Sequence, residues 1–170
     1  MTAAVSAAPA KRRLGWIPLL VAVAWAFALS TLGSTLTDLG PWYQALEQPR
    51  WKPPDLAFPF VWTTIFALCV FAGLIAWTEA PSRAARARVV GLFALNSALN
   101  TGWTVLFFVL KRPDWALWEV GFFWLSIGAL MVAFWGYARL SSALLAVYFV
   151  WVGYAATVNW GVVALNGPFG

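Results

Sequence analysis

Five long stretches without a charged residue constrain the fold of this chain more than any other feature. They cover residues 14–37, 56–78, 89–110, 120–138 and 140–170. An α-helix rises about 1.5 Å per residue, so roughly 20 apolar residues cross the hydrocarbon layer of a bilayer. Only 10% of the 170 residues are charged, against about 25% in soluble domains. We therefore predict an all-α integral membrane bundle of five transmembrane helices, with no separate soluble domain.

The charged residues and prolines set the expected boundaries. We expect helices over residues 15–35, 56–77, 89–110, 115–138 and 141–165. Residues 1–13 are expected to form a disordered basic segment, and residues 14–170 the membrane domain. A basic start, an apolar stretch and small residues near position 27 also fit a secretory signal peptide. The first apolar stretch is longer than a usual signal sequence, which favours a transmembrane helix.

The distribution of Lys and Arg predicts the orientation in the membrane. With five spans, seven of the 11 basic residues fall on the amino-terminal side and four on the opposite side. Cytoplasmic loops of membrane proteins carry an excess of Lys and Arg. The amino terminus is therefore predicted to be cytoplasmic, with loop 37–55 outside.

The composition also narrows the possible chemistry. The chain has no histidine and a single cysteine, Cys69, so we expect no intramolecular disulfide, no metal site and few acid–base catalysts. Glu119 is the one acidic residue near an apolar stretch, and it lacks a second carboxylate for acid–base work. The net charge of +5 belongs to the membrane-flanking loops, so we expect no nucleic-acid partner.

Loop 37–55 and the start of the next helix are rich in proline and tryptophan. Each proline fixes φ and removes an amide donor, so Pro49, Pro53 and Pro54 exclude a helix interior there. Pro59 falls in the first turn of the following helix, where a missing N–H costs little. This pattern predicts a rigid aromatic loop leading directly into a transmembrane helix. Tryptophans that only anchor the membrane interface are the simpler alternative.

The helix expected over residues 89–110 has two distinct faces. At 100° per residue, Asn96, Asn100 and Trp103 fall on one stripe. The opposite face carries small residues that suit close packing against a neighbouring helix, either of this chain or of a second subunit; they are Ala94, Ala98 and Gly102. Asparagines facing lipid are costly, so they should face the protein interior. They either line a ligand pocket or hydrogen-bond to neighbouring helices.

The last helix repeats this arrangement. Tyr148, Trp151 and Asn159 lie on one stripe together with Ala155. With Trp62 on the second long helix, Trp151 gives the bundle two indole rings that could bracket a flat ligand. The alternative is that both rings simply fill the core.

The ordered residues of these segments strongly resemble the TspO/MBR family, the tryptophan-rich sensory proteins and mitochondrial translocator proteins. The resemblance covers about residues 15–163. The matching residues are Trp42, Tyr43, Leu46, Pro49, Trp51, Pro53, Pro54, Phe58, Pro59, Val61 and Trp62 around the loop, Asn96, Asn100 and Trp103, and Tyr148, Trp151 and Asn159. One departure is Val147, where the family often has proline, and it predicts a straighter last helix.

The resemblance implies a homodimeric receptor or transporter-like protein of a bacterial cell membrane, with loop 37–55 covering a ligand pocket. The implied ligand is a tetrapyrrole such as protoporphyrin IX, with no other cofactor and a sensory or regulatory role. The implied ligand-binding residues are Tyr43, Trp51, Trp62, Asn96, Asn100, Trp103, Tyr148, Trp151 and Asn159.

Two other functions stay open. The protein could promote light-dependent oxidative degradation of bound porphyrin, with Trp62 and Trp151 as the candidate redox residues. It could instead be a regulatory scaffold in pigment or carotenoid metabolism. Mammalian family members carry a sterol-contact motif late in the last helix. Here no Lys or Arg follows Arg139, so sterol binding is not expected.

Overall fold

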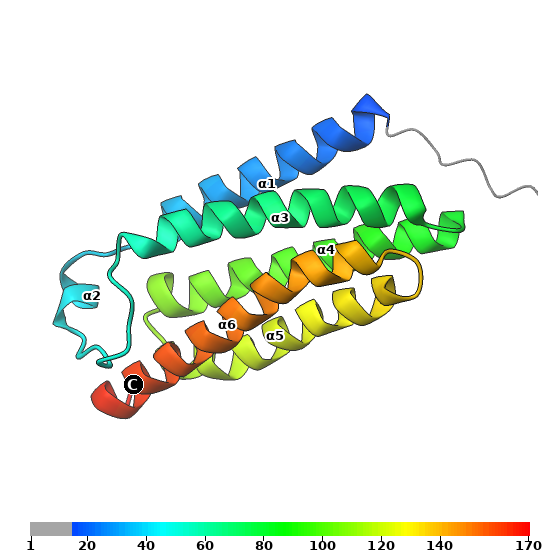
Figure 1. Ribbon diagram of the computed structural model, residues 1–170. Coiled ribbons are helices and arrows are strands. Elements are labelled where there is room, and N and C mark those ends of the chain that lie inside the picture. The colour runs from blue at the N-terminus through cyan, green and yellow to red at the C-terminus, as the bar shows by residue number, and fades with distance from the viewer. Residues whose placement is uncertain (1–14) are drawn as a thin grey trace, which may run out of the picture.

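The structure, a computed structural model, describes residues 15–170. Within these residues it is entirely helical, and five helices are long and apolar enough to cross a membrane, as predicted (Figure 1). The basic segment 1–13 lies outside the described residues. The elements are α1 (Trp16–Leu36), α2 (Pro41–Ala45), α3 (Ala57–Glu79), α4 (Arg83–Thr104), the π-helical η1 (Val105–Val109), α5 (Pro113–Trp135) and α6 (Arg139–Asn166).

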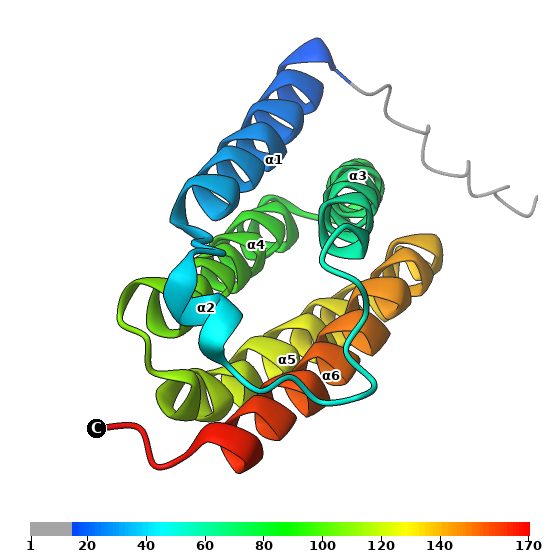
Figure 2. The ribbon, with the colours of Figure 1, turned by 90° about the vertical axis from the view of Figure 1, so that its left-hand side faces the viewer.

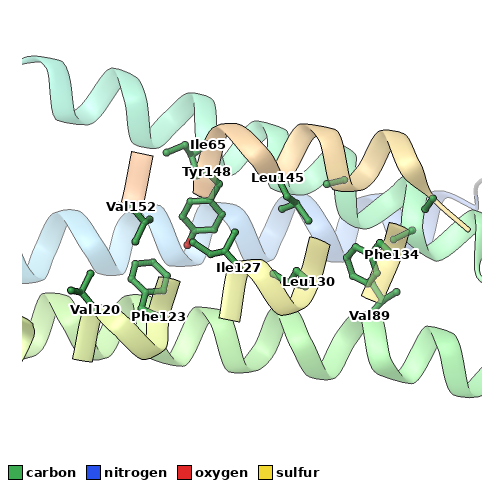
Figure 3. Close-up of a cluster of buried hydrophobic side chains, with 13 residues drawn as sticks. Ile65, Val89, Val120, Phe123, Ile127, Leu130, Phe134, Leu145, Tyr148 and Val152 are labelled. Carbon is green, nitrogen blue, oxygen red and sulfur yellow. The ribbon is translucent and has the colours of Figure 1, made fainter. Parts of the chain in front are cut away.

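The core lies where α5 and α6 pack along each other and against α3 and α4. Phe123, Ile127, Leu130 and Phe134 project from α5 at helical spacing and are almost completely buried. Tyr148 of α6 lies among them (Figure 3). In a bilayer such packing is favoured by van der Waals contact between helices, because lipid tails are as apolar as the side chains.

Helix α1 is peripheral. Not one of its residues is buried, and it packs mainly against α3 and α4. Figure 2 shows α1 standing apart from α5 and α6 at the edge of the bundle. Its side chains therefore face lipid to a much greater extent than those of the other long helices.

Three local features differ from the prediction. Helix α4 begins at Arg83, six residues before the expected start, because the Ser82 hydroxyl accepts a hydrogen bond from the backbone N–H of Ala85 at 3.1 Å and caps the helix. A short helix, α2, begins at Pro41 inside loop 37–55. The helix expected to run regularly to Leu110 ends in the π-helical η1, where Phe107 and Phe108 are both buried.

The second half of loop 37–55 is fastened to the end of α6. The backbone N–H of Glu47 donates to the Asn166 side chain at 2.8 Å, and the Asn166 amide donates to the Glu47 carbonyl at 2.8 Å. Pro49 lies so close to Gly161 that a Cβ there would be 2.8 Å from the proline ring. The Tyr154 hydroxyl also donates to the Trp51 carbonyl. The loop thus crosses one end of the bundle as a docked segment (Figure 2).

Candidate ligand-binding site

A cavity of about 380 Å³ lies between the long helices at the end that loop 37–55 crosses. We call it the loop-side cavity. Its size falls within the range of small-molecule sites. Its lining comes from α1, loop 37–55 and all four other long helices. The aromatic and polar members of that lining are Ser30, Ser34, Thr37, Tyr43, Asp55, Phe58, Trp62, Thr63, Phe66, Asn100, Trp103, Thr104, Phe108, Phe123 and Trp151.

Five of the nine predicted ligand-binding residues line this cavity: Tyr43, Trp62, Asn100, Trp103 and Trp151. The indole N–H of Trp151 is buried and has no hydrogen-bond partner among the described residues. A buried donor without a partner costs free energy, and a bound acceptor would remove that cost.

Two of the remaining four predicted residues form a polar bridge at mid-bundle. The Tyr148 hydroxyl donates to Asn96 Oδ1 at 3.2 Å and accepts from Asn100 Nδ2 at 3.5 Å. Asn96 Nδ2 also donates to Ser126 Oγ at 2.8 Å. The bridge joins α4, α5 and α6. Asn96 and Tyr148 therefore make helix-to-helix hydrogen bonds, and both also line a second cavity bounded mainly by α1, α3 and α4. Asn100 lines both cavities and joins the bridge.

Asn159 forms a hydrogen bond with Trp103, which lines the loop-side cavity. Its Oδ1 accepts the indole N–H of Trp103 at 3.0 Å, and its Nδ2 donates to the Pro113 carbonyl at 2.9 Å. The side chain is almost completely buried. Asn159 thus fixes the orientation of the Trp103 ring without itself lining the cavity.

Trp51 lies outside the loop-side cavity. Its ring packs near Gly161 on α6, and the residue is 46% exposed. In this structure Trp51 anchors the loop. The sequence motif alone does not separate this anchoring position from a lining position.

A charged cluster in the loop was not predicted from the sequence. Lys52 forms an ion pair with Asp55, and the Tyr43 hydroxyl donates to Asp55 at 2.9 Å and accepts from Lys52 at 3.0 Å. The hydrogen bond from Lys52 lowers the pKa of Asp55. Burial tends to lower the pKa of Lys52, but its hydrogen bonds to Asp55 and Tyr43 outweigh this effect and raise it. Burial raises the pKa of Tyr43. All three groups therefore keep their ordinary charge near neutral pH.

The contribution of α1 was also missed, although a signal for it exists. Ser30, Gly33, Ser34 and Thr37 all line the cavity. They recur at i, i+3, i+4 and i+7, the spacing of one helix face. A stripe of small and polar residues in an otherwise apolar helix indicates a face turned toward protein or a cavity.

The predicted dimer face lies on the outside of the single chain. Ala94 and Ala98 are exposed and Gly102 is partly covered. A Cβ on Gly102 would lie 3.7 Å from a carboxylate oxygen of Glu119, and both oxygens of that carboxylate are buried without a hydrogen-bond partner in residues 15–170. Ala94 and Ala98 are therefore the exposed part of this face, whereas Gly102 lies near Glu119 of α5.

These features define a class: a five-helix integral membrane protein with an aromatic cavity enclosed between its helices beneath one docked loop. The chain belongs to the TspO/MBR family, whose pattern matches residues 16–165.

Three relatives illustrate the range of the family. "Protein CrtK" of Rhodobacter capsulatus is 35% identical over 130 residues, which cover 75% of this chain and 79% of the relative. "Tryptophan-rich protein TspO" of Chlorobaculum tepidum is 33% identical over 153 residues, covering 88% and 96%. "Translocator protein" of Sus scrofa is 32% identical over 122 residues, covering 71% and 72%.

Proposed function

We propose that this protein binds a flat, largely apolar tetrapyrrole such as protoporphyrin IX in the loop-side cavity. The setting we propose is a bacterial cell membrane with the amino terminus in the cytoplasm, and the role is sensory or regulatory. The observation that carries the proposal is the meeting of Trp62 and Trp151, from two separate helices, in one cavity.

The chemistry of the lining suits such a ligand. Indole faces stack on flat conjugated rings, and each such pair is worth about 0.5–1.5 kcal/mol beyond the area it buries. The free N–H of Trp151 could donate to an acceptor on the ligand. The sequence has no histidine, so a haem iron would find no imidazole ligand. Metal-free porphyrin should therefore bind at least as tightly as haem.

The test is a titration of the purified protein with protoporphyrin IX, followed by quenching of tryptophan fluorescence. Trp62→Phe and Trp151→Phe should each weaken binding by about tenfold or less, because about 1.4 kcal/mol corresponds to one decade. Trp118→Phe is the matched control, since Trp118 is 81% exposed on α5. An unchanged dissociation constant in both cavity variants would refute the assignment. No binding by the unmutated protein would favour the regulatory scaffold.

Light-dependent degradation of the bound porphyrin is a second candidate function. The favouring observation is that each cavity tryptophan contacts a tyrosine: the ring centroids lie 6.2 Å apart for Trp62 and Tyr148, and 5.8 Å apart for Trp151 and Tyr154. Dioxygen is the oxidant: its addition across a carbon–carbon bond of the porphyrin ring, followed by cleavage of that bond and of the O–O bond, would place both oxygen atoms in the opened product. Electron transfer from either indole to the excited porphyrin would start this step, and the electron would return to the indole at its end. Until then the tyrosines could share the oxidised state of the indole.

Illumination of the complex in air separates the two candidates. New absorbing products that appear with the unmutated protein, and vanish in both phenylalanine variants despite retained porphyrin, would show a catalytic role. Phenylalanine is the informative replacement because it is much harder to oxidise than an indole. Stable porphyrin absorbance under light would leave ligand binding as the function.

A further inference from the structure

A second cavity lies along α1, α3 and α4, away from loop 37–55. We call it the lateral cavity. It measures about 260 Å³ and meets the loop-side cavity at Phe66 and Asn100, which line both. Its lining is apolar apart from four residues near its inner end: Asn96, Ser97, Asn100 and Tyr148. The residues used below are Trp25, Ala26, Trp77, Val89, Phe93 and Asn100.

The lateral cavity extends over about half of the membrane. Along α4 its lining runs from Val89 to Asn100, and eleven steps of about 1.5 Å give roughly 16 Å. The hydrocarbon layer of a bilayer is about 30 Å thick. The cavity therefore matches the depth of one leaflet, with its polar end, at Asn100, near the midplane and its outer end at Trp77.

The outer end carries positive charge. Arg86 lies seven residues before Phe93, so the two share one face of α4. The Arg86 guanidinium lies 5.3 Å from the centre of the Trp77 ring, and its Nε donates to the Trp77 carbonyl at 3.3 Å. Arg83 precedes Arg86 by one turn. Neither arginine forms an ion pair with a carboxylate of the described residues. Arg88 projects from the opposite side of α4 by the same arithmetic.

The side of the cavity formed by α1 is open to the bilayer. Trp25 and Ala26 line the cavity, yet no residue of α1 is buried. An apolar space of this kind within the hydrocarbon layer is filled by what surrounds it, because an empty cavity loses dispersion contacts on every side. The surrounding molecules are lipids.

We propose that the lateral cavity holds one acyl chain of an anionic phospholipid, whose phosphate lies against Arg86 and Arg83. Three features select this ligand: a length that matches one leaflet, an apolar lining, and a guanidinium at the outer end that has no ion-pair partner in the described residues. The guanidinium fork matches phosphate oxygens geometrically. This site does not depend on the proposed porphyrin function, because its lining shares only Phe66 and Asn100 with the loop-side cavity.

The test uses phosphatidylcholine vesicles that contain the protein and a small fraction of chain-brominated lipid, either phosphatidylglycerol or phosphatidylcholine. Bromine quenches the fluorescence of nearby indoles. The difference in quenching between the unmutated protein and Trp25→Phe is the contribution of Trp25, and it reports on lipid in the lateral cavity. Brominated phosphatidylglycerol should quench Trp25 more strongly. Arg86→Gln should reduce that preference about fivefold, since one basic residue at a membrane surface is worth about that factor.

Two matched controls sharpen the result. Arg88→Gln removes the same charge from the other side of α4 and should leave the preference nearly unchanged. Ala26→Phe fills the cavity and should abolish Trp25-dependent quenching by both lipids, whereas Ala28→Phe, at an exposed position of α1, should not. Circular dichroism and size-exclusion chromatography of each variant check that the bundle is intact.

Equal quenching by the two lipids would overturn the proposal, as would equal effects of Arg86→Gln and Arg88→Gln, which would indicate a general surface charge. A failure of porphyrin binding in the unmutated protein would refute the proposed function but leave the lipid preference as measured.

Discussion

At the scale of single residues, the Lys52–Asp55–Tyr43 cluster determines how loop 37–55 meets the loop-side cavity. Asp55 and Tyr43 line the cavity, and Lys52 bonds to both. The lowered pKa of Asp55 means that its ion pair stabilises the fold above the ordinary carboxyl pKa and is lost only as the pH falls through the lowered value. The raised pKa of Lys52 preserves the pair until the pH rises through that raised value.

The cluster should therefore make ligand retention insensitive to pH between about 5 and 9. Asp55→Asn removes the carboxylate while keeping a similar shape, so it should raise the porphyrin dissociation rate over this whole range. Mixing the porphyrin complex in a stopped-flow instrument with excess apo-myoglobin, which captures the released porphyrin, measures that rate. A pronounced pH dependence in the unmutated protein would contradict this role of the cluster.

Asn159 is the second residue with a defined supporting role. Asn159→Ala removes the acceptor of the Trp103 N–H and the donor to Pro113. Hydrogen bonds between membrane helices contribute on average about 0.6 kcal/mol and at most about 1.7 kcal/mol, so we expect a loss of about 1–2 kcal/mol in the free energy of unfolding. The control is Ser97→Ala, because the Ser97 hydroxyl bonds only within α4, to the Phe93 carbonyl. Denaturation in mixed micelles compares the two, and equal stability would contradict the bridging role.

The sequence motif predicted Trp62 and Trp151 as partners, and the structure places both in one cavity. The motif could not show that Trp51 lies against α6 and not in the cavity, because a motif gives the order of residues along the chain but not the path of an irregular loop. Nor could the Lys52–Asp55 pair be found, since its formation depends on the backbone path through Pro53 and Pro54, which lie between the two side chains in an irregular segment.

At the scale of elements, the close approach of loop 37–55 to α6 depends on one glycine. Alanine is preferred to glycine in a helix by about 1 kcal/mol, but a Cβ at Gly161 would lie 2.8 Å and 2.9 Å from two atoms of the Pro49 ring. Gly161→Ala should therefore displace the loop and raise the porphyrin dissociation rate. Gly121→Ala is the control, since a Cβ there meets nothing within 4 Å. Identical rates in the two variants would show that the loop does not retain the ligand.

The lengths of the apolar stretches predicted the number and order of the long helices well, because the thickness of the bilayer sets the length of a spanning helix. Their ends were less predictable. We expected the helix to begin after Arg88, because Arg88 is charged. Arginine side chains near a helix end can extend to the lipid headgroups, and α4 accordingly begins at Arg83. The π-helical η1 depends on packing Phe107 and Phe108 against the loop, which no local pattern reveals.

At the scale of the whole molecule, we propose a homodimer formed through the small-residue face of α4. Ala98→Leu should shift the protein toward the monomer in mild detergent, because a larger side chain prevents close approach of two helices. Light scattering combined with size-exclusion chromatography measures the mass. Ala28→Leu, at an exposed position of α1, controls for added bulk on a lipid-facing helix. An unchanged mass in Ala98→Leu would exclude this face as the dimer contact.

The peripheral position of α1 has a consequence for the biogenesis of the protein. Helix α1 is synthesised before its main packing partners, α3 and α4, which are inserted only later. Helix α1 has no buried residue, so until those partners are inserted it can remain in the bilayer as a single helix surrounded by lipid. Helix α1 therefore joins the fold only after α3 and α4 have been inserted, although it precedes both in the chain.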